Sequence, residues 1–200
     1  MSKKSIKASL PCYASHKPMD LVVGGEVYRV YGGSCIHPAY TEANVYVGLD
    51  VGVSAIPFRG DWSKHPEQVY YPIQDMSVPD NVAKFKALVF GLLIRIQEGK
   101  TVHIGCIGGH GRTGLVLAAL VKIATGNKDA IDYVRKNYCK HAVETHDQVL
   151  WLCKHFDLNE PESTHPKVSL FQGLQDPSLY QQAFTYEVKP VEIAQHFRIL

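Results

Sequence analysis

A cysteine and an arginine enclose a short, glycine-rich segment near the middle of the sequence. The residues between Cys106 and Arg112 are Ile107, Gly108, Gly109, His110 and Gly111, and Thr113 follows. Glycine allows positive φ angles and lets an anion approach the backbone closely. An arginine can then donate two parallel hydrogen bonds to the same anion. The pattern therefore indicates a loop that wraps an anion beside a thiol.

The elements on either side of this loop would activate the thiol. "TVHIGC" predicts a strand that ends at Cys106, and the apolar spacing from Arg112 to about Thr125, ending at Gly126, predicts a helix. In a strand–loop–helix turn, backbone N–H groups and the positive end of the helix face one space. Such surroundings bring a cysteine pKa of about 8.5 down to roughly 3.5–7.5. The thiolate form is the nucleophile.

Two simpler interpretations compete with this one. Taken alone, Cys106 is best explained as a small buried side chain; its register with Gly109, Arg112 and Thr113 overturns that interpretation. The Walker A loop of nucleotide-binding proteins ends in Gly-Lys-Ser/Thr. Aligned on that ending, the sequence has Cys106 where the first glycine belongs and Arg112 where the lysine belongs. An ATPase is therefore disfavoured.

The rest of the chain predicts strands first and helices later. Short apolar runs predict a hairpin within 20–33 and strands at 43–50, 53–58, 67–73 and 101–106. Helical spacing predicts helices at 82–99, 112–125, 127–138 and 145–156. Asp80 or Asn81 is expected to cap the first helix, Asn127 the third, and Thr145 with Gln148 forms a capping box for the last. This order argues for an α/β layer with a central sheet.

Composition excludes several classes of protein. Lys and Arg number 21 and Asp and Glu 19, so a net charge of +2 gives no general attraction to nucleic acid or to an anionic membrane. No run is long enough to span a bilayer, and no secretory signal is expected at the start. Five cysteines without a C-x-x-C pair disfavour a disulfide framework and fit a cytoplasmic setting. The histidines show no spacing typical of metal ligands, so no metal is expected.

The segment "CIGGHGRTG" resembles the Cys-x5-Arg signature of the cysteine-dependent protein tyrosine and dual-specificity phosphatases. The resemblance extends upstream through "YYPIQDMSVPDN" and downstream through "AIDYVRKNYCKHAVETHDQVLWLCKHF", so it covers roughly residues 45–157. It implies a compact dual-specificity phosphatase fold, with a central mixed sheet flanked by helices and a strand–phosphate-loop–helix unit at residues 101–125. The expected domains are a catalytic domain at 1–158 and a C-terminal extension of unknown role at 159–200.

The resemblance also implies roles for individual residues. Cys106 would be the nucleophile, the backbone of 107–112 the phosphate cradle, and Arg112 the clamp on the phosphoryl oxygens. Thr113 would donate its hydroxyl to the departing thiolate. Asp75 is the expected general acid, with Asp80 as a competitor that is better explained as a helix cap. The chemistry needs no cofactor.

Three positions depart from the family or have a second explanation. The histidine that usually precedes the cysteine is replaced by Gly105, and His103 lies two residues earlier on the same strand face. His103 either supplies part of the missing positive field or is held within the sheet. Gln148 matches a water-orienting glutamine of some relatives, but its capping role explains it equally well. His110 stands where phosphoinositide-directed relatives carry lysine, which disfavours a lipid headgroup.

The expected function is phosphomonoester hydrolysis through a cysteinyl-phosphate, with a tyrosine or dual-specificity phosphatase favoured. The partner would be a phosphorylated protein or a small phosphomonoester, not a membrane. RNA 5′ ends or small nucleotides are an alternative substrate class, although the near-neutral charge disfavours a long nucleic acid. A phosphate-binding pseudophosphatase is the alternative without turnover. The retention of Cys106, Arg112, Thr113 and an acid argues against it.

Overall fold

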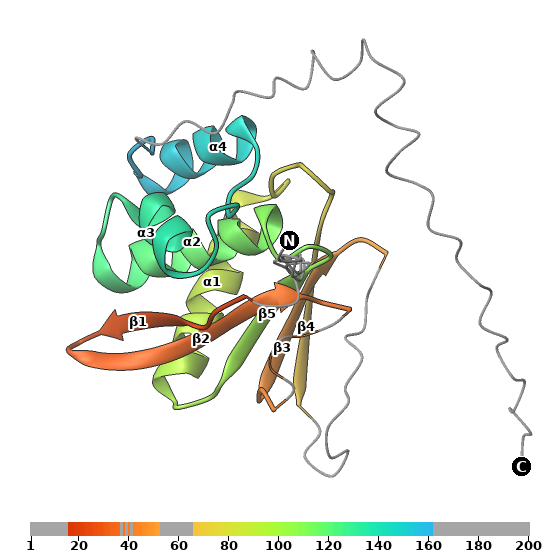
Figure 1. Ribbon diagram of the computed structural model, residues 1–200, viewed down its shortest axis with the longest axis vertical. Helices are drawn as coiled ribbons and strands as arrows, with labels where there is room; N and C mark the ends of the chain where they lie inside the picture. Colours follow the sequence, from red (N-terminus) through yellow and green to blue (C-terminus); the bar gives the residue numbers. More distant parts are fainter. Residues whose placement is uncertain (1–15, 37, 39, 41, 53–65, 162–200) are drawn as a thin grey trace, which may run out of the picture. The chain divides into compact units, whose positions relative to one another are not determined.

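A five-stranded mixed sheet forms the centre of the fold (Figure 1). The computed structural model describes residues 16–36, 38, 40, 42–52 and 66–161. The sheet order is β1-β2-β5-β3-β4, with β1 antiparallel to β2 and the other neighbours parallel. The strands are β1 Met19–Val23, β2 Glu26–Ser34, β3 Val45–Asp50, β4 Glu67–Ile73 and β5 Val102–Cys106. The predicted strand at 53–58 lies outside the described residues.

The first two strands form the hairpin that the sequence predicts. Val23 pairs with Glu26, which leaves Gly24 and Gly25 as a two-residue turn. These glycines have φ angles of 60° and 90°. A two-residue turn with positive φ at both positions matches the right-handed twist of the strands beside it.

The two middle strands, β5 and β3, are buried along their whole length. Parallel strands that are covered on both faces have continuous apolar sequences instead of alternating ones, as seen here. The pairing of β3 with β4 has an irregularity between Gly48 and Asp50, after which Asp50 lies opposite Ile73. The carboxyl ends of β5, β3 and β4 therefore bring Cys106, Asp50 and the chain leading to Asp75 to the same edge of the sheet.

Four helices flank the sheet: α1 Val82–Gln97, α2 Gly111–Thr125, α3 Ala130–Asn137 and α4 His146–Phe156. Helix α2 lies at the centre of the helical layer, where it contacts the other three helices and strands β5 and β1 (Figure 1). Every residue from Gly111 to Val121 is buried. A helix that is apolar on all sides is one that neighbours cover on all sides. The element that follows the glycine-rich loop is thus fixed by the core.

The helix ends confirm some of the sequence predictions and correct others. Thr145 and Gln148 form the predicted capping box of α4, and Gly126 ends α2 with a φ of 73°. Asn81, not Asp80, caps α1, since its side chain accepts the Lys84 N–H at 2.9 Å.

Helix α3 begins at Ala130, with Asp129 at its N-cap. The predicted cap, Asn127, instead accepts the N–H of Asp129 at 2.9 Å within the preceding turn. The side-chain bond that Asn127 was expected to give the helix therefore stabilises the turn before it.

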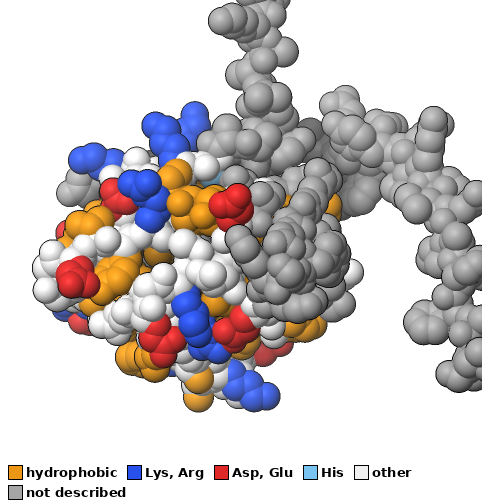
Figure 2. All heavy atoms as spheres, turned by 90° about the horizontal axis from the view of Figure 1, so that it is seen from below, with side chains coloured by type: hydrophobic (Ala, Val, Ile, Leu, Met, Phe, Trp, Pro, Cys, Tyr) orange, Lys and Arg blue, Asp and Glu red, His pale blue; other side chains and the backbone are white. Residues whose placement is uncertain are grey.

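Charges of both signs are mixed on the surface shown in Figure 2, where Lys and Arg side chains of the described residues alternate with Asp and Glu. This agrees with the small net charge of the sequence, +2. Among the described residues, no helix has the length and apolar composition needed to cross a bilayer. Residues 162–200, most of the predicted C-terminal extension, lie outside the described part of the chain.

Candidate active site

Cys106 is the last residue of β5, and its sulfur receives two hydrogen bonds. The Gly109 N–H lies 3.2 Å from Sγ and the Thr113 hydroxyl lies 3.3 Å from it. The Cys106 N–H in turn donates to Thr113 Oγ1 at 3.1 Å, which fixes the direction of the hydroxyl. Two donors pointing at one sulfur stabilise that sulfur when it carries a negative charge. The structure thus brings together the cysteine, the glycine and the threonine that the sequence singles out.

The loop after Cys106 has its shape because Gly109 is a glycine. Its φ is 73°, and a Cβ there would lie 2.7 Å from both Gly33 Cα and the His16 ring. The Tyr138 hydroxyl donates to the Gly109 carbonyl at 2.7 Å. The loop is therefore packed between β2 and the segment after α3. The predicted cradle runs from the end of β5 into the first turn of α2. Its residues are Ile107, Gly108, Gly109, His110, Gly111 and Arg112.

Arg112 is buried and bonded to two carboxylates. Its Nη1 lies 2.8 Å from Asp50 Oδ2 and 3.1 Å from the Ile73 carbonyl, and its Nη2 lies 2.9 Å from Asp75 Oδ1. Burial by itself would lower the pKa of Arg112, but the Asp50 hydrogen bond and the charges of Cys106 and Asp75 raise it above its ordinary value. The side chain is a permanent positive charge held close to the cysteine.

Asp50 is a functional candidate that the sequence analysis missed. It ends β3, is buried, and uses its second oxygen to accept the Gly52 N–H at 2.8 Å. In the sequence it is simply the last residue of a predicted strand. The available clue was a carboxylate at the carboxyl end of a parallel strand, the edge at which α/β sheets bind ligands.

Asp75, the predicted acid, lies on the loop between β4 and α1 and is 69% exposed. It lies within a turn that is closed by a hydrogen bond of 3.1 Å from the Ser77 N–H to the Gln74 carbonyl. Because Asp75 Oδ1 contacts Arg112 while the rest of its side chain faces solvent, the carboxyl lies beside the cradle. Asp80 is exposed immediately before the Asn81 cap.

Glu144 is a second residue that the sequence analysis missed. Its carboxylate accepts the Gly111 N–H at 2.8 Å and lies 3.5 Å from His110 Nδ1. Burial would raise the pKa of Glu144, but His110, the Gly111 N–H and Arg112 lower it below the usual value. An anion entering the cradle must therefore compete with an ionised carboxylate for the Gly111 N–H.

The structure gives a physical reason for Gly105. A Cβ at this position would lie 2.8 Å from the backbone nitrogen of Cys35 and 2.9 Å from its Cα. The Cys35 N–H donates to the Cys106 carbonyl at 2.8 Å, which holds the two segments together. Backbone therefore occupies the space where the side chain of a preceding histidine would begin.

His103 lies in the interior of the sheet, two residues before Gly105. It is fully buried in β5, and burial together with the charge of His16 lowers its pKa to about 4. Its ring packs against Tyr46 with 5.7 Å between centroids, and within the described part of the chain neither ring nitrogen has a hydrogen-bond partner. Burial and the lowered pKa favour the second explanation, in which His103 is held within the sheet.

Comparisons with solved structures show which fold this is. The model superposes on Tk-PTP in its active form with a TM-score of 0.51 and 28% identity, over 58% of this chain and 80% of that one. It also matches kinase associated phosphatase, in a form whose catalytic site cysteine is replaced by serine. That match has a TM-score of 0.54 and 16% identity, over 71% of this chain and 94% of that one. Human DUSP28 matches with a TM-score of 0.54 and 15% identity, over 64% of this chain and 91% of that one. The fold is that of the tyrosine and dual-specificity phosphatases.

Sequence comparisons give shorter matches. Uncharacterized protein MJ0215 of Methanocaldococcus jannaschii is 42% identical over 80 residues, which are 40% of this chain and 49% of that protein. A tyrosine phosphatase homologue of Invertebrate iridescent virus 3 is 36% identical over 59 residues, 28% of this chain and 25% of the viral protein. The chain therefore spans half or less of the length of these relatives. A scan of family models found no match.

Gln148 is buried, and protein contacts use both ends of its side-chain amide. Its Oε1 accepts the Thr145 N–H at 3.3 Å, and its Nε2 donates to the Ser77 carbonyl at 3.0 Å. This second bond connects helix α4 to the loop that carries Asp75. Its role in orienting water stays a prediction, while its capping role is confirmed.

Proposed function

We propose that this chain is a phosphomonoester hydrolase that acts on phosphorylated proteins through a cysteinyl-phosphate intermediate. One observation carries the proposal: the sulfur of Cys106, the buried guanidinium of Arg112 and the carboxylate of Asp75 lie at the same edge of the sheet. The Thr113 hydroxyl lies 3.3 Å from the sulfur, and Arg112 Nη2 lies 2.9 Å from Asp75 Oδ1. The phosphatase fold supports the same conclusion.

The first step would transfer the phosphoryl group to sulfur. The Cys106 thiolate attacks phosphorus in line with the ester oxygen, so an S–P bond forms while the P–O bond breaks. Asp75, in its protonated form, gives its proton to the departing oxygen. Arg112 and the N–H groups of the loop stabilise the charge on the equatorial oxygens, and they are already in place when that charge develops.

The second step would return the enzyme to its starting state. The Asp75 carboxylate takes a proton from water, whose oxygen attacks phosphorus while the S–P bond breaks. Inorganic phosphate leaves, and the electron pair returns to Cys106 as a thiolate. The Thr113 hydroxyl, 3.3 Å from Sγ, stabilises that leaving group.

Phosphotyrosine and phosphoserine or phosphothreonine in proteins are the substrates that the site favours. Two large apolar side chains are exposed: Ile107 in the cradle, at 42%, and Tyr70 in β4, five residues before Asp75, at 43%. An aromatic phosphoester could pack against such apolar groups. His110 in place of a lysine disfavours a polyphosphorylated lipid headgroup. The tyrosine phosphatase homologues among the viral proteins support the same substrate class.

The direct test is hydrolysis of p-nitrophenyl phosphate in the presence of EDTA. The wild-type chain should turn over, and Cys106→Ser should lose activity completely while remaining folded. Cys153→Ser on α4, away from the cradle, is the matched control and should retain activity. If a folded wild-type chain hydrolyses neither this ester nor phosphopeptides, the proposal is wrong and a phosphate-binding pseudophosphatase takes its place.

A further inference from the structure

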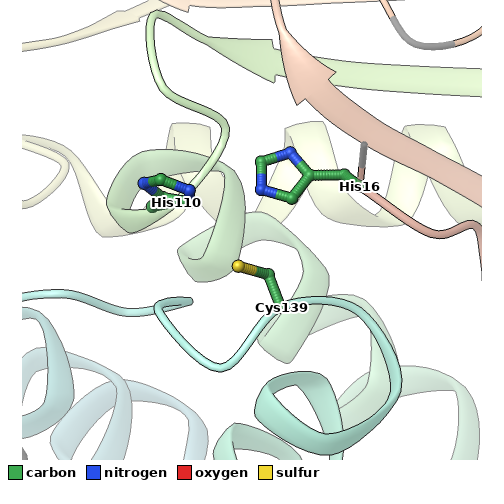
Figure 3. A group of neighbouring side chains, drawn as sticks. All are labelled: His16, His110 and Cys139. Atoms are coloured by element: carbon green, nitrogen blue, oxygen red, sulfur yellow. The ribbon is translucent and has the colours of Figure 1, made fainter. Parts of the chain in front are cut away.

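Three metal-binding side chains from distant parts of the sequence converge beside the phosphate loop. They are His16 from the segment before β1, His110 from the loop itself and Cys139 from the segment after α3. One ligand atom from each lies within 4.8 Å of the other two. Figure 3 shows the sulfur of Cys139 pointing to the space between the two imidazole rings. The sequence analysis expected no metal because it could consider only ligands that are close in sequence.

Burial makes this cluster unusual. His16 and Cys139 are only 8% and 7% exposed. Within the part of the chain that the structure describes, neither ring nitrogen of His16 has a hydrogen-bond partner. A buried polar group without a partner destabilises the folded chain, so such groups call for an explanation. A ligand that accepts the nitrogen lone pair would provide one.

The surroundings of the cluster are those of a metal centre. A metal-bound histidine usually has its second ring nitrogen beside a carboxylate or carbonyl. His110 has a carboxylate beside one ring nitrogen, because Glu144 Oε1 lies 3.5 Å from its Nδ1. Cysteine binds metal as the thiolate, so an ion bound here would displace the thiol proton of Cys139.

We propose that His16, His110 and Cys139 bind one divalent ion of the zinc class. Zinc takes imidazole nitrogen at about 2.0–2.1 Å and thiolate at about 2.3 Å in a tetrahedron, which places ligand atoms roughly 3.3–3.8 Å apart. The present separations are at most 4.8 Å, so binding would require side-chain rotations that bring the ligand atoms closer together. Three protein ligands leave the fourth position for solvent. One sulfur and two nitrogens do not suit magnesium or calcium, which prefer oxygen.

A bound ion would link the phosphate loop to two other segments. His110 lies within the cradle, whereas His16 precedes the β-hairpin and Cys139 follows α3. These segments already touch at Tyr138, whose ring is 4.8 Å from that of His16 and whose hydroxyl holds Gly109. The ion would thus fix the loop without contacting Cys106. This role is separate from catalysis and does not depend on the proposed hydrolysis.

The test uses the full chain in a Cys106→Ser background, which removes the cradle thiolate as a competing ligand. Zn²⁺ binding is measured by isothermal titration, and Co²⁺ binding by its absorption spectrum. We expect one tight site, a thiolate-to-cobalt charge-transfer band, and a rise in Tm with Zn²⁺ but not with Mg²⁺. Cys139→Ser should abolish the charge-transfer band, and His16→Gln should weaken Zn²⁺ binding more than about tenfold, since even losing a supporting residue outside the ligand shell costs about 10–100-fold.

Matched controls separate this site from general metal binding by thiols and imidazoles. Cys153→Ser and His155→Gln on α4 should leave stoichiometry, affinity and spectrum unchanged. Cys139→Ala and His16→Ala are second variants in case either first one fails to fold, as judged by circular dichroism. The inference is overturned if the folded Cys106→Ser chain takes up no stoichiometric Zn²⁺. It is equally overturned if the folded His16 and Cys139 variants bind as tightly as their parent.

Discussion

Asp50 and Arg112 form a buried ion pair in which Oδ2 and Nη1 are 2.8 Å apart. The Arg112 side chain is 3% exposed and that of Asp50 12%. Since the other Asp50 oxygen is held by the Gly52 N–H, the carboxylate is itself fixed. The pair therefore sets the direction in which the guanidinium faces the cradle. Asp50 is a positioning residue, because it acts through Arg112.

Replacing Asp50 should weaken phosphate binding. We expect Asp50→Asn to raise the Kd for vanadate and the KM for phosphoester at least about tenfold, because the guanidinium loses its fixed partner. The free energy of unfolding should fall by about 1–3 kcal/mol, the usual effect of leaving a buried charge short of a partner. Asp50→Glu should restore part of the phosphate affinity and part of the stability. The exposed pair of Asp20 with Arg29 is the control, and Asp20→Asn should change neither. Unaltered vanadate affinity in Asp50→Asn would contradict the positioning role.

Asp75→Asn should separate chemistry from binding. The general-acid role predicts a fall in kcat of about 100- to 10,000-fold on substrates with poor leaving groups. Vanadate affinity should stay the same or increase, because Asp75 competes for Arg112 Nη2 at 2.9 Å. Asp80→Asn, five residues later in an exposed position, should leave both unchanged. Loss of vanadate binding in Asp75→Asn, or normal kcat, would show that Asp75 has another role.

A histidine at position 105, as in the phosphatases that the sequence resembles, should destabilise the protein. Even Gly105→Ala places a Cβ 2.8 Å from the Cys35 backbone nitrogen, so one backbone must move. Overpacking of this kind costs about 1–3 kcal/mol, and Gly105→His should cost more. Gly91→Ala inside α1 meets only the flexible end of Arg95 at 3.3 Å and should be neutral or stabilising. Urea unfolding measures both. An unchanged midpoint for Gly105→Ala would show that the close approach does not exist.

His103 should make stability depend on pH. Burial, and to a smaller extent the charge of His16, lowers its pKa from 6.5 to about 4 in the folded chain. Between these values the unfolded chain binds a proton that the folded chain does not, so stability falls as pH decreases from 6.5 toward 4. The loss reaches up to about 3 kcal/mol. His103→Leu should remove this slope, whereas His146→Gln at an exposed position should keep it. Parallel stability curves for wild type and His103→Leu would refute the prediction.

The local features of the site could be predicted from the sequence. Cys106, Gly109, Arg112 and Thr113 lie within eight residues of one another, so the strand and helix on either side fix their arrangement. The capping box of Thr145 and Gln148 is local for the same reason. Where two neighbours could do the same task, as with Asp80 and Asn81, the sequence did not decide, because either side chain can accept the N–H of the first turn.

The features that the sequence did not reveal all depend on contacts between distant segments. Asp50 reaches Arg112 only because β3 lies between β5 and β4 in the sheet. Glu144 reaches Gly111 from the segment before α4. Position 105 requires glycine because β2 brings the Cys35 backbone alongside β5. No periodicity or spacing encodes these contacts, since each follows from strand order and packing.

If the proposed function is right, Cys106 carries the phosphoryl group during turnover. The most direct measurement mixes enzyme and substrate, quenches with acid within milliseconds, and locates the modification by mass spectrometry of the digested chain. We expect one phosphoryl group on Cys106 in the wild type and none in Cys106→Ser. With a good leaving group, a larger fraction of the Asp75→Asn chains should be phosphorylated. Turnover without any phosphoryl group on Cys106, or hydrolysis that persists in Cys106→Ser, would contradict the proposed function.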